Sequence, residues 1–366
     1  MSARIVSLGT AVPDTAVSQQ ELRDFFAGQP GTDPLTRRLI SAAFDAAGIS
    51  TRHSVLSGLG GLPDGVFVAE DGALRRPTTG VRNDLYRETA PDLAADAARR
   101  ALSDGAVAAE QITHVVSVSC TGFFAPGIDY RLVRDLGLDA DVARTHLGFI
   151  GCAAALPALR TASQITAAEP HAVVLVVCVE LCSLHIRDLP DPEQIVAASV
   201  FADGAAAAVV TADDAVGTPG GLVLERFGTT LTEEGESDMV WTVGDHGFRM
   251  RLSAEVPRII GREIRSAVQS FLGGEPTPDT WAVHPGGRSV LDRVEAGLEL
   301  PDSALTTSRA VLRDRGNMSS ATLLFILAEL LDDPTIEDAP LVALAFGPGL
   351  TVESALIHKV SPDART

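Results

Sequence analysis

The order of strand-like and helix-like segments repeats along this chain, and this repeat constrains the fold more than any other feature. The first half reads strand, helix, helix, strand, strand, at residues 114–119, 128–138, 152–168, 172–180 and 204–211. The second half has the same order, at residues 280–284, 288–298, 317–331, 341–346 and 350–357. Apolar strands alternating with helices are typical of a sheet that is covered on both faces. The sequence therefore predicts an α/β protein of two equivalent halves, residues 1–212 and 213–366.

Four residues with useful chemistry occupy corresponding ends of these elements. Cys120 and His284 each end the first strand of their half, while Cys152 and Asn317 each open a long helix directly after a glycine. If the halves pack about a pseudo-twofold axis, the four side chains meet in the middle of the molecule. A cysteine in the first turn of a helix faces unpaired N–H groups, which favour the thiolate.

Each of these residues also has an ordinary interpretation. Cys152 alone could be a buried core residue, His284 could be structural, and Asn317 could be no more than a helix N-cap. Placed together at corresponding element ends, however, they form the pattern of a nucleophile with a base and a hydrogen-bond donor. The N-terminal half then carries the nucleophile, and the C-terminal half carries its two partners.

Composition excludes several classes of protein. The 366 residues are 46% hydrophobic with a formal net charge of −19, so the chain is globular and as a whole repels nucleic acid and anionic membranes. No apolar stretch can span a bilayer, and the N-terminus lacks the regions of a signal peptide. Four cysteines are too few for a disulfide framework, and Cys178 and Cys182 lack the spacing of a zinc site. We therefore expect a cytoplasmic enzyme with reduced thiols and no metal.

Several longer segments carry a resemblance to a known family. They are Gly151-Cys-Ala-Ala-Ala-Leu-Pro-Ala-Leu159, Val200-Phe-Ala-Asp-Gly204, His284-Pro-Gly-Gly-Arg288, Arg315-Gly-Asn-Met-Ser-Ser-Ala321 and Phe346-Gly-Pro-Gly-Leu-Thr-Val-Glu353. In their order and spacing, these segments resemble the chalcone synthase-like type III polyketide synthases, including bacterial members, of the thiolase superfamily. The resemblance runs from about Val115 to the C-terminus.

The resemblance implies a thiolase-like, five-layered αβαβα fold, a homodimer and a mechanism. Cys152 would take an acyl starter from coenzyme A, and His284 and Asn317 would stabilise the enolate formed when malonyl-CoA loses carbon dioxide. Repeated decarboxylative Claisen condensation would build a short poly-β-keto chain that cyclises. The resemblance implies coenzyme A thioesters as substrates, with no redox cofactor, metal or acyl carrier protein. Phe201 would be the gatekeeper between the coenzyme A tunnel and the cavity.

Six further residues are assigned to the gate and cavity by the same resemblance: Met250, Cys120, Cys182, His185, Trp241 and Ser319. Cys120 is either a reactive thiol or, as we favour, a passive wall residue. His185 is a proton donor during cyclisation or a wall histidine with satisfied hydrogen bonds, and the sequence leaves both open. Trp241 stands where plant enzymes have glycine, which predicts a smaller cavity and a short product.

Coenzyme A also needs basic residues near the tunnel. Plant enzymes carry them on an N-terminal helix, here predicted at residues 35–47, but the matching face has Ala42 and Ala46. Arg37 and Arg38 lie one or two turns earlier on that helix. Gly286, Gly287 and Arg288 border the other candidate position, at the Pro-Gly-Gly loop. Any of the three arginines could pair with the phosphates, but the ordinary interpretation of each is a solvated surface arginine.

Two alternatives remain at this stage. The first is a ketoacyl synthase that starts fatty acid synthesis with the same three residues but with an acyl-carrier-protein partner. The second is a non-catalytic or thiol-redox α/β protein in which Cys152 is incidental. The second would require several motifs to coincide without a reason, so the condensing enzyme is preferred.

Overall fold

The computed structural model describes residues 2–187, 192–336 and 338–361. Its strands are β1 (Arg4–Ala11), β2 (Thr15–Ser18), β3 (Thr51–Ser54), β4 (His114–Ser119), β5 (Ala143–Gly148), β6 (Val173–Leu181), β7 (Asp203–Thr211), β8 (Gly221–Leu231), β9 (Met239–Gly244), β10 (Gly247–Leu252), β11 (Thr280–Val283), β12 (Ala339–Gly347) and β13 (Thr351–Val360). Its α-helices are α1 (Gln19–Ala27), α2 (Pro34–Ala46), α3 (Thr79–Asp104), α4 (Ile128–Leu136), α5 (Ala155–Ala168), α6 (Pro192–Val200), α7 (Val256–Leu272), α8 (Arg288–Leu298), α9 (Thr306–Arg315) and α10 (Ala321–Asp332). Short 3₁₀ turns lie at η1 (Ser57–Gly60), η2 (Ala109–Gln111), η3 (Gly151–Ala153) and η4 (Cys182–His185).

Two half-sheets, one from each half of the chain, carry the fold. Over the described residues the strand order is β11-β12-β13-β8-β1-β7-β6-β4-β5. The N-terminal half supplies β5-β4-β6-β7-β1, and the C-terminal half supplies β11-β12-β13-β8. The two join where β1 pairs with β8 over two residue pairs, Arg4 with Val223 and Ile5 with Leu222.

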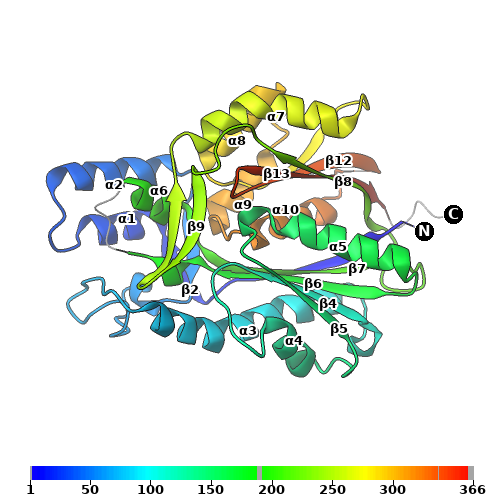
Figure 1. Cartoon of the computed structure of the whole chain (residues 1–366), viewed down its shortest axis with the longest axis horizontal. Helices are drawn as coiled ribbons and strands as arrows, with labels where there is room; N and C mark the ends of the chain where they lie inside the picture. Colours follow the sequence, from blue (N-terminus) through cyan, green and yellow to red (C-terminus); the bar gives the residue numbers. More distant parts are fainter. Residues whose placement is uncertain (1, 188–191, 337, 362–366) are drawn as a thin grey trace.

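Helices complete five layers (Figure 1). α3 and α4 cover the outer face of the N-terminal half-sheet, α5 and α10 lie between the half-sheets, and α7 and α8 cover the outer face of the C-terminal one. α10 is apolar on nearly all sides because neighbours bury it all around. The predicted αβαβα architecture is confirmed.

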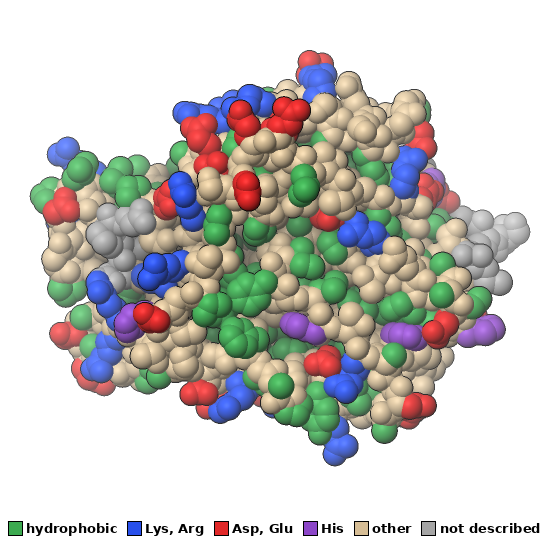
Figure 2. Space-filling model, in the orientation of Figure 1, with side chains coloured by type: hydrophobic (Ala, Val, Ile, Leu, Met, Phe, Trp, Pro, Cys, Tyr) green, Lys and Arg blue, Asp and Glu red, His purple; other side chains and the backbone are tan. Residues whose placement is uncertain are grey.

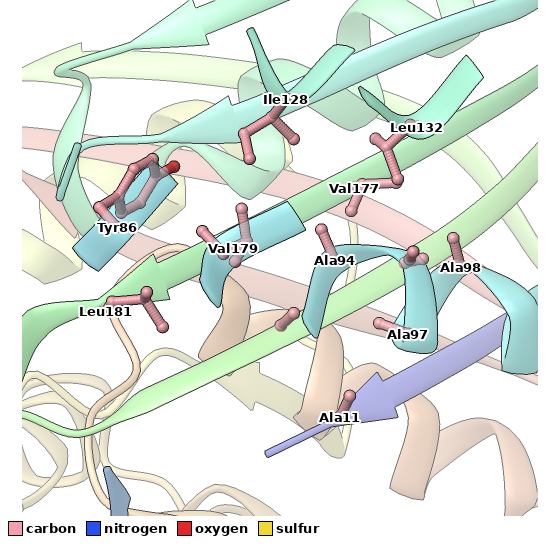
Figure 3. Packing of buried hydrophobic residues seen from close by; sticks show 14 of the residues in the cluster. Ala11, Tyr86, Ala94, Ala97, Ala98, Ile128, Leu132, Val177, Val179 and Leu181 are labelled. Carbon is pink, nitrogen blue, oxygen red and sulfur yellow. The ribbon is translucent and has the colours of Figure 1, made fainter. Parts of the chain in front are cut away.

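Small side chains allow α3 to lie close against the sheet. Ala94, Ala97 and Ala98 line the helix face toward the strands, opposite Val177 and Val179 of β6 (Figure 3). On β1, a Cβ added at Gly9 would come within 2.3 Å of the Ala97 carbonyl oxygen. The close approach of α3 to the sheet therefore requires alanines on the helix and glycine at position 9 of the strand. Larger side chains at either place would not fit.

The predicted buried strands at 114–119, 172–180 and 280–284 are confirmed as β4, β6 and β11, each within one residue. Two predicted helix starts are wrong. Cys152 lies in η3 and α5 begins only at Ala155, while Asn317 precedes α10, which begins at Ala321. In both halves an irregular turn separates the functional residue from the helix.

Residues 57–89 are rich in Gly, Pro and Asp, which predicts a surface loop, and this prediction is wrong in its last part. α3 begins at Thr79, because the Thr78 side chain caps the helix by accepting from the Val81 N–H. The edge strand β5 escaped prediction for a different reason: most of its residues are exposed, so it lacks the apolar pattern of its neighbours.

Candidate active site

The backbone around Cys152 leaves little freedom for the thiol. Gly151 has a φ of +80°, and a Cβ there would lie 2.6 Å from Cδ of Pro348, so only glycine fits before the cysteine. Pro348 belongs to the turn between β12 and β13, which therefore holds η3 from the other half of the molecule. Cys152 itself is buried, with 8% of its surface exposed.

His284 follows β11, and its backbone N–H donates to the Leu344 carbonyl at 2.8 Å, which extends the strand pairing. Its ring is 1% exposed, and within the described residues neither ring nitrogen has a hydrogen-bond partner. A buried polar group without a partner costs about 1–3 kcal/mol. An imidazole kept in this condition is available to a ligand rather than committed to the fold.

Asn317 is held by both its backbone and its side chain. Its N–H donates to the Val200 carbonyl at 2.9 Å, and its carbonyl accepts from the Ala202 N–H at 2.8 Å, so the chain on either side of Phe201 is tied to it. Its Oδ1 accepts from the Ser319 N–H at 2.9 Å, and its Nδ2 donates to the Gly286 carbonyl at 3.4 Å. The amide thus faces the loop that follows His284.

Two hollows meet at Cys152. The outer one, of about 400 Å³, has Cys152, His284 and Asn317 in its wall together with Gly286, Gly287 and Arg288. The inner one is a smaller cavity of about 70 Å³. Its wall includes the predicted residues Cys120, Cys182, His185, Trp241 and Ser319. Phe201 and Met250 line both spaces, as Met239 does, so the two residues predicted for the gate lie where the hollow and the cavity meet.

Burial dominates the proton affinities of the two central groups. Desolvation raises the pKa of the Cys152 thiol to about 11, although hydrogen bonding to Ser319 and Asn317 opposes the shift. Desolvation also lowers the pKa of His284 to about 3. Each group resists carrying an isolated charge, so a thiolate at Cys152 requires a positive neighbour that shares the same buried space.

A buried acid that sequence reasoning missed lies behind Cys120 and Thr121 of the inner wall. Glu180 is fully buried at the end of β6, and it accepts from Ser320 Oγ at 2.6 Å, Thr121 Oγ1 at 2.8 Å and the Cys120 N–H at 3.0 Å. Burial raises the pKa of this carboxyl group. The signal in the sequence was a single glutamate inside an otherwise apolar strand.

Cys120 is coupled to the same acid. Its thiol lies 3.4 Å from Glu180 Oε1 and 3.5 Å from the Ser319 hydroxyl. Burial raises the pKa of Cys120 well above its usual value, and the neighbouring Glu180 carboxylate raises it further. These surroundings favour a neutral thiol and support the wall role over a second nucleophile.

The two alternatives for His185 are separated by its hydrogen bonds. Its Nε2 donates to the Thr121 carbonyl at 2.7 Å, and its Nδ1 accepts from the Phe248 N–H at 3.0 Å. Its ring stacks on Phe248 with centroids 4.2 Å apart, and burial lowers its pKa to about 3. Both nitrogens are therefore committed to the backbone, which supports a wall histidine rather than a proton donor.

Another missed residue fixes the gate. Arg52 is buried, and its Nη1 donates to the carbonyl oxygens of Ala198 and Phe201, each at 2.7 Å. The guanidinium therefore holds the end of α6 and the turn that carries Phe201. Nothing in the local sequence distinguished it from a solvated arginine, because its acceptors are about 150 residues away.

The four cysteines are free and buried, as expected of reduced thiols. In the described part of the chain, no three His, Cys, Asp or Glu side chains gather in a way that suits a metal ion. The same residues contain no helix with the length and apolarity needed to cross a membrane.

Comparison with known proteins identifies this arrangement. Residues 1–214 match the N-terminal domain of chalcone and stilbene synthases, and residues 227–361 match the C-terminal domain of the same enzymes. The chain belongs to the chalcone and stilbene synthase family. The two family models thus divide the chain between residues 214 and 227, and Cys152 lies in the first match while His284 and Asn317 lie in the second.

Individual relatives agree with the family. "Alpha-pyrone synthesis polyketide synthase-like Pks18" of Mycobacterium tuberculosis is 33% identical over 362 residues, covering 97% of this chain and 90% of that protein. "Probable polyketide synthase 1" of Dictyostelium discoideum is 31% identical over 370 residues, and the match spans 97% of this chain but only 11% of that protein. The solved C-terminal type III polyketide synthase domain of "Steely1", a type I/III hybrid from Dictyostelium, superimposes with a TM-score of 0.91 at 30% identity, covering 99% of this chain and 100% of that one.

Proposed function

We propose that the protein is a type III polyketide synthase, an acyltransferase that loads an acyl starter from coenzyme A on Cys152 and extends it with malonyl-CoA. The observation that carries the proposal is the junction of an outer hollow and an inner cavity at one buried thiol. A thioester arm can enter from the outer side, while the growing chain occupies the inner side. The family membership supports the same assignment.

In the loading step, His284 accepts the Cys152 proton as the sulfur attacks the thioester carbonyl, and coenzyme A leaves as its thiol. In the extension step, N–H donors of His284 and Asn317 bind the thioester oxygen of malonyl-CoA. Loss of carbon dioxide leaves an enolate, whose negative oxygen these donors stabilise. The enolate carbon then attacks the acyl group on Cys152, and the sulfur departs.

Phe201 supports decarboxylation from the gate. Its ring gives the junction an apolar wall, which disfavours a solvated carboxylate and favours its loss as neutral carbon dioxide. Met250 takes the second gate position with a flexible thioether in place of a ring. The extended chain cyclises in the inner cavity, and its small volume suits a short poly-β-keto chain.

The remaining parts of the proposal follow from the substrates. Free coenzyme A thioesters suffice without an acyl carrier protein, and no metal or redox cofactor takes part. We place the enzyme in the cytoplasm, where its four thiols stay reduced. We also propose a homodimer, for which β5 offers an exposed sheet edge.

The test is to incubate the purified protein with malonyl-CoA and a panel of acyl-CoA starters, and to identify products by mass spectrometry. Polyketide products without added carrier protein support the proposal. Products formed only from malonyl-acyl carrier protein would instead indicate the ketoacyl synthase. No acyl transfer to Cys152 from any thioester would remove the condensing function altogether.

A further inference from the structure

The outer hollow is lined by segments of different character. α2 contributes only the small side chains of Ala43 and Ala46, followed by its C-cap Ala47. The first two turns of α7 and α8 contribute three arginines, Arg258, Arg288 and Arg293. The hollow therefore has a local group of basic residues in its wall, although the chain carries a net charge of −19.

Two of these three arginines have no acidic partner among the described residues. Arg288 and Arg293 are exposed, and neither makes an ion pair or a side-chain hydrogen bond with any described residue. Asp292 is the acid of the same wall, and it is paired with Arg309 at 2.8 Å. Arg258 pairs with Glu255 on the surface. Such an exposed ion pair contributes little free energy, so Arg258 can leave Glu255 to bind a phosphate group.

The backbone adds to this charge. Gly287 is the N-cap of α8 and provides no side-chain acceptor for the first N–H groups of the helix. The positive end of the α8 dipole therefore opens onto the same hollow as Arg288 and Ser289. Basic and acidic groups are interspersed over the face shown in Figure 2.

We propose that Arg258, Arg288 and Arg293 of α7 and α8 bind the phosphate groups of the coenzyme A nucleotide, and that α2 does not. The inference rests on the proposed function, because it names the group that fixes the substrate at the entrance to that site. Guanidinium groups suit phosphate oxygens by charge and by bidentate geometry. The pantetheine arm then runs inward past Gly286 and Gly287, which have no side chains to obstruct it, to Cys152.

Two of the three arginines expected from the sequence lie elsewhere. Arg37 and Arg38 stand in the first turns of α2 and are not part of the wall of the hollow. Arg37 instead donates to the Ala27 carbonyl at the end of α1, at 3.2 Å. Arg288 is thus the one expected arginine that the structure places at the entrance.

The experiment compares R258A, R288A, R293A and the double variant R258A/R293A with the wild type. We expect the KM for malonyl-CoA to rise by about tenfold per arginine, the size of one charge-assisted hydrogen bond, with kcat nearly unchanged. For malonyl-pantetheine, which has no nucleotide phosphates, the KM should be the same in all variants. The matched control is R265A, an exposed arginine of α7 that pairs with Glu299 away from the hollow.

Calorimetry measures the binding of coenzyme A without requiring catalysis. Its result is therefore independent of whether the protein makes polyketides. A wild type without polyketide activity would refute the proposed function, yet weaker coenzyme A binding in R258A/R293A would still support the phosphate site. Unchanged coenzyme A binding and unchanged KM in the double variant would overturn the inference. An R38A variant that alone raised the KM would move the phosphate site to α2 and would overturn it equally.

Discussion

Cys152 carries the acyl group, whereas His284 and Asn317 stabilise the enolate. Replacing Cys152 should therefore have a different effect from replacing either of the other two residues. In C152A no acyl group can be loaded, and we expect condensation to fall by more than about 10³-fold. Decarboxylation of malonyl-CoA should continue slowly, because His284 and Asn317 still stabilise the enolate. Product analysis and acetyl-CoA release measure the two steps. In the comparison variant N317A, the rates of both decarboxylation and condensation should fall. A C152A enzyme with full condensing activity would refute the assignment of Cys152 as the nucleophile.

The thiolate itself should depend on His284. The surroundings of Cys152, burial above all, raise its pKa to about 11, and an imidazolium sharing the site would lower it by favouring the negative sulfur. In H284Q this positive charge is lost, so the thiol stays protonated and its alkylation by iodoacetamide at neutral pH should slow. The rate should then keep rising with pH up to about 10, whereas the wild-type rate levels off earlier. Identical pH profiles would show that His284 does not set the charge of Cys152.

At this scale the sequence predicted which residues surround the site but not how each one is engaged. Cys152, His284 and Asn317 could be singled out because each sits at an element end beside a glycine or proline. Glu180 and Arg52 could not, because their roles depend on partners brought close only by folding. The hydrogen bonds that distinguish the two roles of His185 are likewise tertiary contacts.

The hairpin of β9 and β10 closes the inner cavity and should control product length. Trp241 and Met250 face each other across the pair, and the Trp241 indole N–H donates to the Cys120 carbonyl at 2.6 Å. The cavity of about 70 Å³ holds only about five water molecules. In W241A the lost ring enlarges this space, so we expect products longer by at least one malonyl unit, seen by mass spectrometry. W241F should behave nearly as the wild type, and unchanged products in W241A would show that another wall sets the length.

Elements with a strong apolar pattern were predictable and the others were not. β4, β6 and α8 could be bounded closely because burial on one or both faces fixes their composition. β5 and β9 are exposed along much of their length, so no periodicity marks them. The turns before α5 and α10 were missed because backbone conformations such as the positive φ of Ser319 leave little trace in the sequence.

At the scale of the molecule, the sheet edge formed by β5 is largely exposed within the described residues. β5 is the last strand of the N-terminal half-sheet, and among the described strands it pairs only with β4. Directly after it comes Phe149, 41% exposed, whose ring lies 6.3 Å from that of Phe123, itself 52% exposed. Hydrophobic side chains also gather near the middle of the face shown in Figure 2. In a monomer, an open sheet edge beside exposed aromatic rings would favour aggregation. In a symmetric dimer, the same edge and rings can be buried between the two copies.

We therefore expect the 38.2 kDa chain to sediment as a dimer at micromolar concentration. F123D places a charge among the exposed aromatic rings, where a dimer interface would desolvate it, and this should shift the protein to monomer. L62D changes a residue that is 70% exposed in the loop after η1, and it should remain dimeric. Sedimentation velocity of the three proteins measures the outcome, and circular dichroism confirms that each is folded. A monomeric wild type would show that this edge is protected in another way, and a dimeric F123D would place the interface on a different surface.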